Sequence, residues 1–174
     1  MTELDRPSRL RRRSLAVAAA LGAAAVMGLA GCAGGEAAPN STFVLLDGSK
    51  ATTADLKGKV TLVNFWATTC VSCVKEMPQI VATWHKYQAQ GFDTVAVAME
   101  YDPPNWVLNF AQSRQLPFKV ALDNTGEVAQ QWGDVKLTPT TYLVDKQGRI
   151  VKRYVGEPDF AALHQLIEKL LAQI

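Results

Sequence analysis

Two cysteines set three residues apart are the part of this sequence with the clearest chemistry. Cys70 and Cys73 follow an apolar run, residues 60–65, that is typical of a buried strand, and they open a helix predicted over residues 70–90. The spacing places both sulfurs on one side of a helical turn, within reach of a disulfide bond. Cys70 falls at the predicted helix N-terminus, where free backbone N–H groups and the helix dipole stabilise a thiolate. The pair therefore predicts thiol–disulfide exchange, in which Cys70 attacks and the more shielded Cys73 resolves.

Other chemistries of a paired cysteine are mostly disfavoured by the rest of the sequence. A zinc site needs two further ligands, and besides Cys32 the chain offers only His85 and His164, which lie far apart. Haem attachment needs a His directly after the second cysteine, where the chain has Val74. Capture of Cu(I) by two thiolates stays open, because soft ligands suit that ion. We therefore expect no resident cofactor or metal, and keep a Cu(I) metallochaperone and a tethered binding module without turnover as alternatives.

The elements that must position the cysteines alternate between strands and helices. Apolar runs and helical periodicity predict strands at residues 43–46, 60–65, 92–99, 118–122, 140–144 and 150–155, and helices at residues 70–90, 103–115, 127–132 and 159–171. The last two strands flank a turn signal, and so predict a hairpin. This order predicts an α/β fold with a mixed sheet flanked by helices.

Charge is distributed unevenly along the 174 residues. Residues 1–31 hold five arginines and two acidic residues, so the remaining residues carry 13 of the 18 basic and 14 of the 16 acidic side chains. The sequence is 48% apolar, which is enough for a core and excludes a disordered chain. Because the basic excess belongs to a segment that we expect to be removed, no nucleic-acid partner is predicted.

The N-terminus is typical of an export signal. Arginines precede an uncharged stretch, residues 14–31, that is rich in Ala, Leu and Gly, and the stretch ends in Leu-Ala-Gly-Cys32. This ending resembles the lipobox of bacterial lipoproteins, which implies cleavage before Cys32 and acylation of its thiol and new amine. We therefore expect a signal peptide at residues 1–31, a flexible tether at residues 32–41 and a domain at residues 42–174, held by lipid on the periplasmic side of a membrane. An uncleaved anchor and twin-arginine export are the alternatives.

Two separated motifs resemble thioredoxin-fold proteins of the TlpA/ResA type. Residues 64–78, NFWATTCVSCVKEMP, are similar to the active-site stretch of that family, and residues 137–150, LTPTTYLVDKQGRI, are similar to its proline loop, strand and hairpin. The resemblance covers about residues 42–173 and implies a thioredoxin fold with an extra β–α insertion. It also implies a monomeric reductant of protein disulfides in cytochrome c maturation or cytochrome oxidase copper-site assembly. Its partners would be apocytochrome c or a copper-assembly protein, with a membrane thiol–disulfide transporter as the electron donor.

The resemblance also assigns residues to a substrate surface. Pro139 corresponds to the cis-proline that faces the two cysteines, and the backbone of Thr138 can pair with an extended substrate strand beside the sulfurs. Trp66 is expected to pack beside the active site and to contribute to substrate binding, although a role as a core aromatic fits it nearly as well.

A proton relay is harder to place from the sequence. Thioredoxins carry a buried Asp where this chain has Asn64, and an Asn side chain cannot titrate. The resemblance implies a Glu elsewhere as the relay, and Glu100, directly after the third predicted strand, is the nearest candidate. Glu76, in the first predicted helix, is expected to face solvent.

Overall fold

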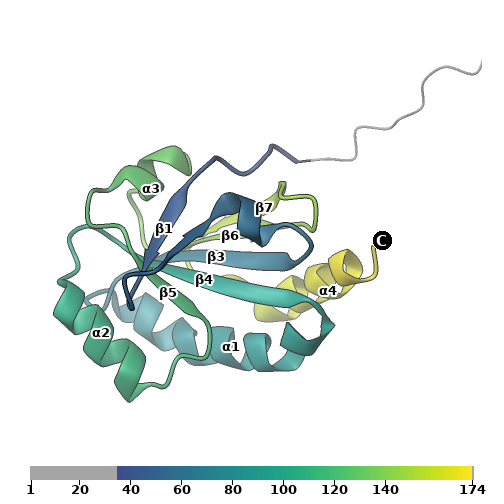
Figure 1. Ribbon diagram of the computed structural model, residues 1–174. Helices are drawn as coiled ribbons and strands as arrows, with labels where there is room; N and C mark the ends of the chain where they lie inside the picture. The colour runs from purple at the N-terminus through teal and green to yellow at the C-terminus, as the bar shows by residue number, and fades with distance from the viewer. Residues whose placement is uncertain (1–34, 174) are drawn as a thin grey trace, which may run out of the picture. The chain divides into compact units, whose positions relative to one another are not determined.

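A single mixed sheet with helices on both faces forms the part of the chain that the computed structural model describes, residues 35–173 (Figure 1). The predicted signal peptide and Cys32 lie outside the described residues. The strands are β1 (Thr42–Leu45), β2 (Lys50–Thr52), β3 (Val60–Trp66), β4 (Phe92–Ala98), β5 (Lys119–Leu122), β6 (Thr140–Val144) and β7 (Ile150–Val155). The α-helices are α1 (Val71–Tyr87), α2 (Pro104–Ser113), α3 (Glu127–Gln131) and α4 (Phe160–Leu171), and short 3-10 helices are η1 (Thr53–Leu56) and η2 (Gln88–Gln90).

The strand order is β2-β1-β5-β4-β3-β6-β7. The three central strands β5, β4 and β3 are parallel, whereas β6 pairs antiparallel with β3, and β7 pairs antiparallel with β6. Because β3 and β4 are parallel neighbours, their carboxyl ends meet at one edge of the sheet, and α1 and α2 follow from there. Between β4 and β6 the chain passes through α2, β5 and α3, and β5 lies beside β4 in the sheet.

Helices divide between the two faces of the sheet. Figure 1 shows α1, α2 and α4 on one side and α3 on the other. Every residue of β3 is buried, and its apolar side chains alternate between two cores: Trp66 packs with the α1, α2 and α4 side, and Phe65 packs with the α3 side. Because β3 is buried on both faces, its position in the sheet is fixed. The loop after Trp66, which leads directly to Cys70, therefore starts from a fixed point.

Most predicted elements are confirmed within one or two residues, and the first helix is shorter than expected. Its expected last turn is the separate 3-10 helix η2, which ends at Gly91 in the left-handed region (φ 94°). The strand β2 and the 3-10 helix η1 were not predicted, because three residues beside a turn carry no periodic signal. No helix among residues 35–173 is long and apolar enough to cross a membrane.

The predicted tether is wrong over its C-terminal half. The backbone N–H of Ile150 donates to the carbonyl of Glu36 at 2.7 Å, and the N–H of Ala38 donates to the carbonyl of Gly148 at 2.9 Å. Residues 36–38 therefore run along the β6–β7 hairpin, and Pro39 and Ser41 are hydrogen-bonded to Thr53. The sequence does not predict this pairing with the hairpin, because the side chains are small and polar and the hydrogen bonds join backbone groups.

Candidate active site

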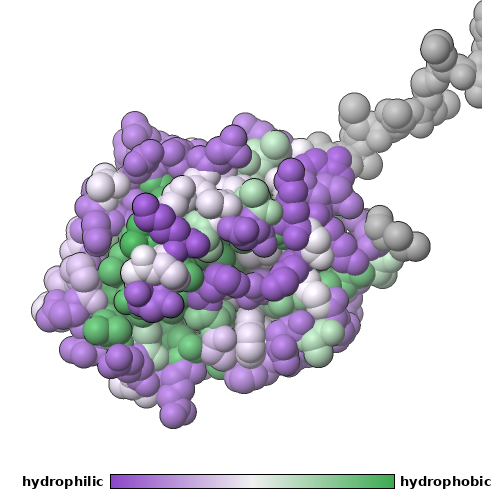
Figure 2. Space-filling view, viewed as in Figure 1, coloured by the Kyte–Doolittle hydropathy of each residue, from purple (hydrophilic) through white to green (hydrophobic). Residues whose placement is uncertain are grey.

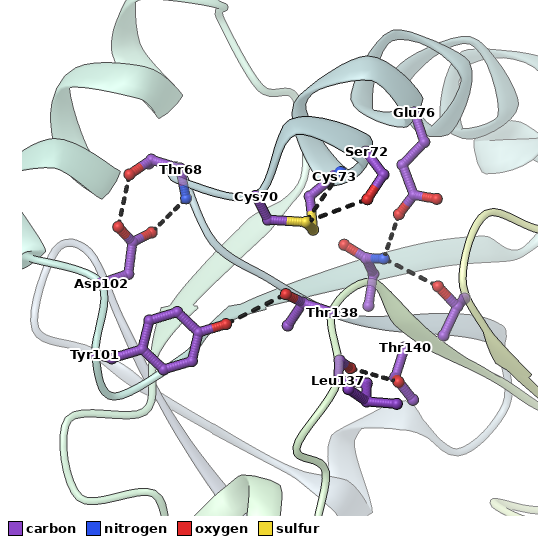
Figure 3. The surroundings of a disulfide bond; sticks show 12 residues. Thr68, Cys70, Ser72, Cys73, Glu76, Tyr101, Asp102, Leu137, Thr138 and Thr140 are labelled. Atoms are coloured by element: carbon purple, nitrogen blue, oxygen red, sulfur yellow. Dashed lines mark hydrogen bonds between the residues drawn. A yellow bond between two sulfur atoms is a disulfide. The ribbon is translucent and has the colours of Figure 1, made fainter.

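The two cysteines form a disulfide at the start of α1 (Figure 3). Their Cα atoms are 5.2 Å apart, and Cys70 is the N-cap residue of the helix. The Cys70 Sγ accepts a hydrogen bond from the backbone N–H of Cys73 at 3.2 Å. Cys70 is partly exposed, whereas Cys73 is fully buried. A partner molecule can therefore reach the sulfur of Cys70 and not that of Cys73, and the helix N-terminus would stabilise a thiolate on Cys70.

The loop that carries Cys70 is tied to the loop after β4. The backbone N–H and the hydroxyl of Thr68 both donate to the carboxylate of Asp102, each at 2.6 Å, and Asp102 is buried. Hydrogen bonds to an ionised acceptor are among the stronger ones in proteins. Asp102 therefore holds the approach to the disulfide in place. The sequence carried no signal for this role, because the two residues meet only at the edge of the folded sheet.

A second loop, before β6, brings Thr138 beside the disulfide (Figure 3). The Thr138–Pro139 peptide bond is cis, as the resemblance implies. The loop is fastened by Gly156, whose N–H donates to the Pro139 carbonyl at 2.8 Å, and by Thr140, whose hydroxyl donates to the Leu137 carbonyl at 2.7 Å. Within residues 35–173 the backbone of Thr138 makes no hydrogen bond. Its N–H and C=O are therefore free to pair with an extended segment of another molecule.

A buried carboxyl group lies one helical turn after Cys73. Glu76 is fully buried, and its Oε1 accepts a hydrogen bond from the Asn64 side-chain amide at 2.9 Å. The same Asn64 amide donates to the Thr141 hydroxyl at 2.9 Å. The expectation that Glu76 faces solvent is thus wrong. Cys73, Glu76 and Ile80 share the buried face of α1, and their i, i+3 and i+7 spacing was the signal that could have placed Glu76 inside.

Burial changes the acidity of this carboxyl group. Desolvation of the buried group is the largest effect, and the pKa of Glu76 is raised to about 7. The hydrogen bond from Asn64 lowers this pKa, and the nearby Glu157 raises it by a smaller amount. Among the described residues, the Oε2 of Glu76 and the Oδ1 of Asn64 have no hydrogen-bond partner. A carboxyl group with a pKa near neutrality can both take up and release a proton, and this one is placed behind the inner cysteine.

Glu100 and Trp66 are the two other residues that the sequence suggested for the site, and Trp66 belongs to the same buried cluster as Cys73. Glu100 is exposed, and its carboxylate lies against Gly126, which precedes α3. Trp66 is fully buried, with its ring 5.1 Å from that of Phe110. A buried ring offers no surface to a substrate, so the expected binding role of Trp66 is wrong and its role is that of a core aromatic. Glu76 thus lies one helical turn after Cys73 on the buried face of α1, whereas Glu100 is exposed.

The fold and the paired cysteines define a thioredoxin-like thiol–disulfide oxidoreductase. The chain belongs to the redoxin family, whose model matches residues 33–167, and within it to the TlpA/ResA-type proteins. It is 36% identical over 137 residues to the thiol-disulfide oxidoreductase ResA of Bacillus thuringiensis subsp. konkukian, which covers 78% of each chain. It is 34% identical over 130 residues to ResA of Bacillus subtilis, covering 75% of this chain and 72% of that one.

Solved structures agree with this assignment. A thioredoxin-like protein from Neisseria meningitidis superposes with a TM-score of 0.73 at 41% identity, covering 78% of this chain and 90% of that chain. A thiol:disulfide interchange protein of the thioredoxin family from Chlorobium tepidum superposes with a TM-score of 0.72 at 26% identity, covering 79% and 97%. These similarities confirm the predicted thioredoxin fold.

Proposed function

We propose that this protein reduces disulfide bonds of other proteins outside the cytoplasm, with Cys70 as the nucleophile and Cys73 as the resolving thiol. The observation that carries the proposal is the inequality of the two sulfurs. Cys70 caps α1 and is partly exposed, whereas Cys73 is buried in front of a carboxyl group whose pKa is about 7. One sulfur is thus arranged to attack a partner and the other to complete the exchange.

The first step joins the protein to its client. In the reduced protein the Cys70 thiolate attacks one sulfur of the client disulfide, so that a Cys70–client disulfide forms and the second client sulfur leaves as a thiolate, which takes a proton from water. The free backbone groups of Thr138 would align the client segment beside Cys70, next to the cis peptide bond at Pro139.

The second step releases the client. The Cys73 thiol transfers its proton to the Glu76 carboxylate, and the Cys73 thiolate attacks the Cys70 sulfur. The Cys70–Cys73 bond forms, the Cys70–client bond breaks, and the client leaves as a thiol after protonation. Two electrons have then passed from the protein to the client. Glu76 suits the proton transfer because its pKa lies close to neutral pH.

Clients, electron donor and location follow from the family resemblance. We propose that the clients are apocytochrome c or a protein of copper-site assembly, that a membrane thiol–disulfide transporter returns the electrons, and that the protein acts as a monomer. Acylation of Cys32 after removal of residues 1–31 would hold the domain on the outer side of the membrane. Only a short segment of chain would then separate the acylated residue from the domain. Each buried methylene group adds about 0.8 kcal/mol of membrane affinity, so the several acyl chains of a lipoprotein would together retain the domain stably.

The midpoint potential of the Cys70–Cys73 pair tests the direction of electron flow. Equilibration with glutathione or dithiothreitol buffers should give a value nearer to the roughly −270 mV of thioredoxin than to the roughly −120 mV of the oxidant DsbA. A value near that of DsbA would make the protein an oxidant and overturn the proposal. Competition for Cu(I) by the reduced protein tests the metallochaperone alternative, which would require copper binding that outcompetes a strong Cu(I) chelator.

A further inference from the structure

An aromatic side chain from the loop after β4 reaches the proline loop across the entrance to the disulfide. Tyr101 directs its hydroxyl to the Thr138 hydroxyl, 3.2 Å away (Figure 3), and the residue is 55% exposed. Tyr101 is neither part of the core nor required for the exchange of electrons between the two cysteines. Its place beside Thr138 nevertheless puts it where a client segment must pass.

The ring of Tyr101 is held at both ends. The next residue, Asp102, is buried and accepts two hydrogen bonds from Thr68, which fixes the backbone beside the ring. The phenol oxygen is held by Thr138 at the other end. An exposed aromatic ring that is already immobilised loses little conformational entropy when a partner packs on it, which is the property of a good contact residue in an interface.

Two further apolar side chains border the same entrance. Val71 follows Cys70 and is 84% exposed, and Leu137 precedes Thr138 and is 66% exposed. Val71 thus adjoins the partly exposed Cys70, and Leu137 adjoins Thr138, whose backbone has no hydrogen-bond partner within residues 35–173. The side chains of Val71, Leu137 and Tyr101 come from three different loops or helix starts, so the apolar border exists only in the folded protein.

We propose that Tyr101 determines substrate specificity, by packing its ring against an apolar side chain next to the reacting cysteine of an extended client segment. The inference rests on the proposed function and adds the class of substrate. While the client backbone pairs with Thr138, the ring of Tyr101 forms the wall on the β4 side, with Leu137 on the β6 side. A client with a polar residue at that position gains less contact with the ring and is reduced more slowly.

Two synthetic peptides test this proposal. Each contains one internal disulfide, and they differ only in the residue next to the first cysteine, which is Leu in one and Ser in the other. The second-order rate constant for reduction by the reduced protein should be higher for the Leu peptide. Tyr101→Ala should lower the rate with the Leu peptide about fivefold and bring the ratio of the two rates close to one, since truncating an interface aromatic costs about 1 kcal/mol or more. Tyr101→Phe keeps the ring and should keep the ratio.

A matched control removes an apolar side chain elsewhere. Apolar surface also gathers over α2 and β5 (Figure 2), where Leu108 lines a separate hollow with Leu46 and Leu116. Leu108→Ala should leave both rate constants unchanged. If wild-type protein reduces both peptides equally, or if Tyr101→Ala keeps the wild-type ratio, the inference about Tyr101 is overturned. If wild-type protein with both thiols reduced acts on neither peptide, the proposed function fails instead.

Discussion

The side-chain amide of Asn64 donates a hydrogen bond to the Oε1 of Glu76 at 2.9 Å, inside the core and one helical turn behind Cys73. Asn64 lies on β3 opposite Thr141 of β6, to which the same amide nitrogen donates. The sheet thus positions Glu76, which itself belongs to α1. Since Asn64 cannot ionise, the proton of this buried cluster belongs to Glu76 alone.

The stability of the oxidised protein should fall as the pH rises through about 7. The folded pKa of Glu76 is raised above the ordinary value of 4.5, so folding is favoured while the group is protonated and is penalised once it must ionise. The loss between pH 5 and pH 8 should be on the order of 2–3 kcal/mol. Glu76→Gln removes the titrating group and should flatten this profile, as measured by urea unfolding with the disulfide intact.

Glu100→Gln is the matched control for this measurement and tests the relay expected from the sequence. Glu100 is exposed, so its amide variant should keep the wild-type pH profile. In the reduced protein, Glu76→Gln should also shift the pH dependence of thiol alkylation, whereas Glu100→Gln should not. If Glu100→Gln shifted the pH dependence of alkylation and Glu76→Gln did not, Glu100 would be the proton relay.

Asn64→Asp should create a pair of carboxyl groups that share one proton. Two carboxylates at hydrogen-bond distance in a buried site cannot both ionise cheaply, and a protonated Asp can still donate to Glu76. The variant should be close to wild type in stability at pH 5 and about 3 kcal/mol or more less stable at pH 8. Asn109→Asp, on the exposed side of α2, controls for the added charge. A variant equally stable at both pH values would show that the two side chains separate.

The two sulfurs should differ in their reactivity. A limiting amount of iodoacetamide should modify the reduced protein first at Cys70, which caps α1, because Cys73 is buried. Cys70→Ser should abolish exchange with protein disulfides, whereas Cys73→Ser should accumulate a covalent mixed disulfide with the client. Peptide mapping and non-reducing electrophoresis read out the two results. Trapping by the Cys70→Ser variant would reverse the assignment.

Asp102→Asn should loosen the loop that leads to Cys70. The substitution keeps the size of the side chain but replaces one acceptor oxygen with an NH₂ group facing either the N–H or the hydroxyl of Thr68. We expect a loss of about 1–3 kcal/mol in the free energy of unfolding. Asp134→Asn, at an exposed position, should change stability by less than about 0.5 kcal/mol. If the two variants changed the free energy of unfolding equally, Asp102 would not have the structural role described.

Membrane attachment should depend on Cys32. If this residue is acylated, Cys32→Ser should release the domain from the membrane fraction or leave an unprocessed precursor, and the mature wild-type protein should lack residues 1–31. Mass spectrometry of the N-terminal peptide and fractionation measure both. An N-terminus at Met1, or retention of the variant in the membrane without lipid at position 32, would contradict the lipoprotein hypothesis.

The sequence by itself was enough for the chemistry and most of the architecture. The spacing of Cys70 and Cys73 at the junction of an apolar strand and a helix predicts the redox pair, because both the spacing and the helix start are local properties. The same holds for the alternation of strands and helices. The cis form of Pro139 came from resemblance to a family, since the residue itself is compatible with either isomer.

Only the tertiary structure decided which side chains surround the cysteines. Glu76 and Asn64 are twelve positions apart and meet because α1 packs on β3. Asp102 reaches Thr68 because the parallel strands β3 and β4 end at one edge of the sheet, and Tyr101 reaches Thr138 because the antiparallel strand β6 begins at that same edge. A carboxyl group in an amphipathic helix looks solvated in a sequence, and Trp66 beside an active site looks like a contact residue. Their burial depends on which elements cover them, and that is a property of packing between distant segments rather than of local spacing.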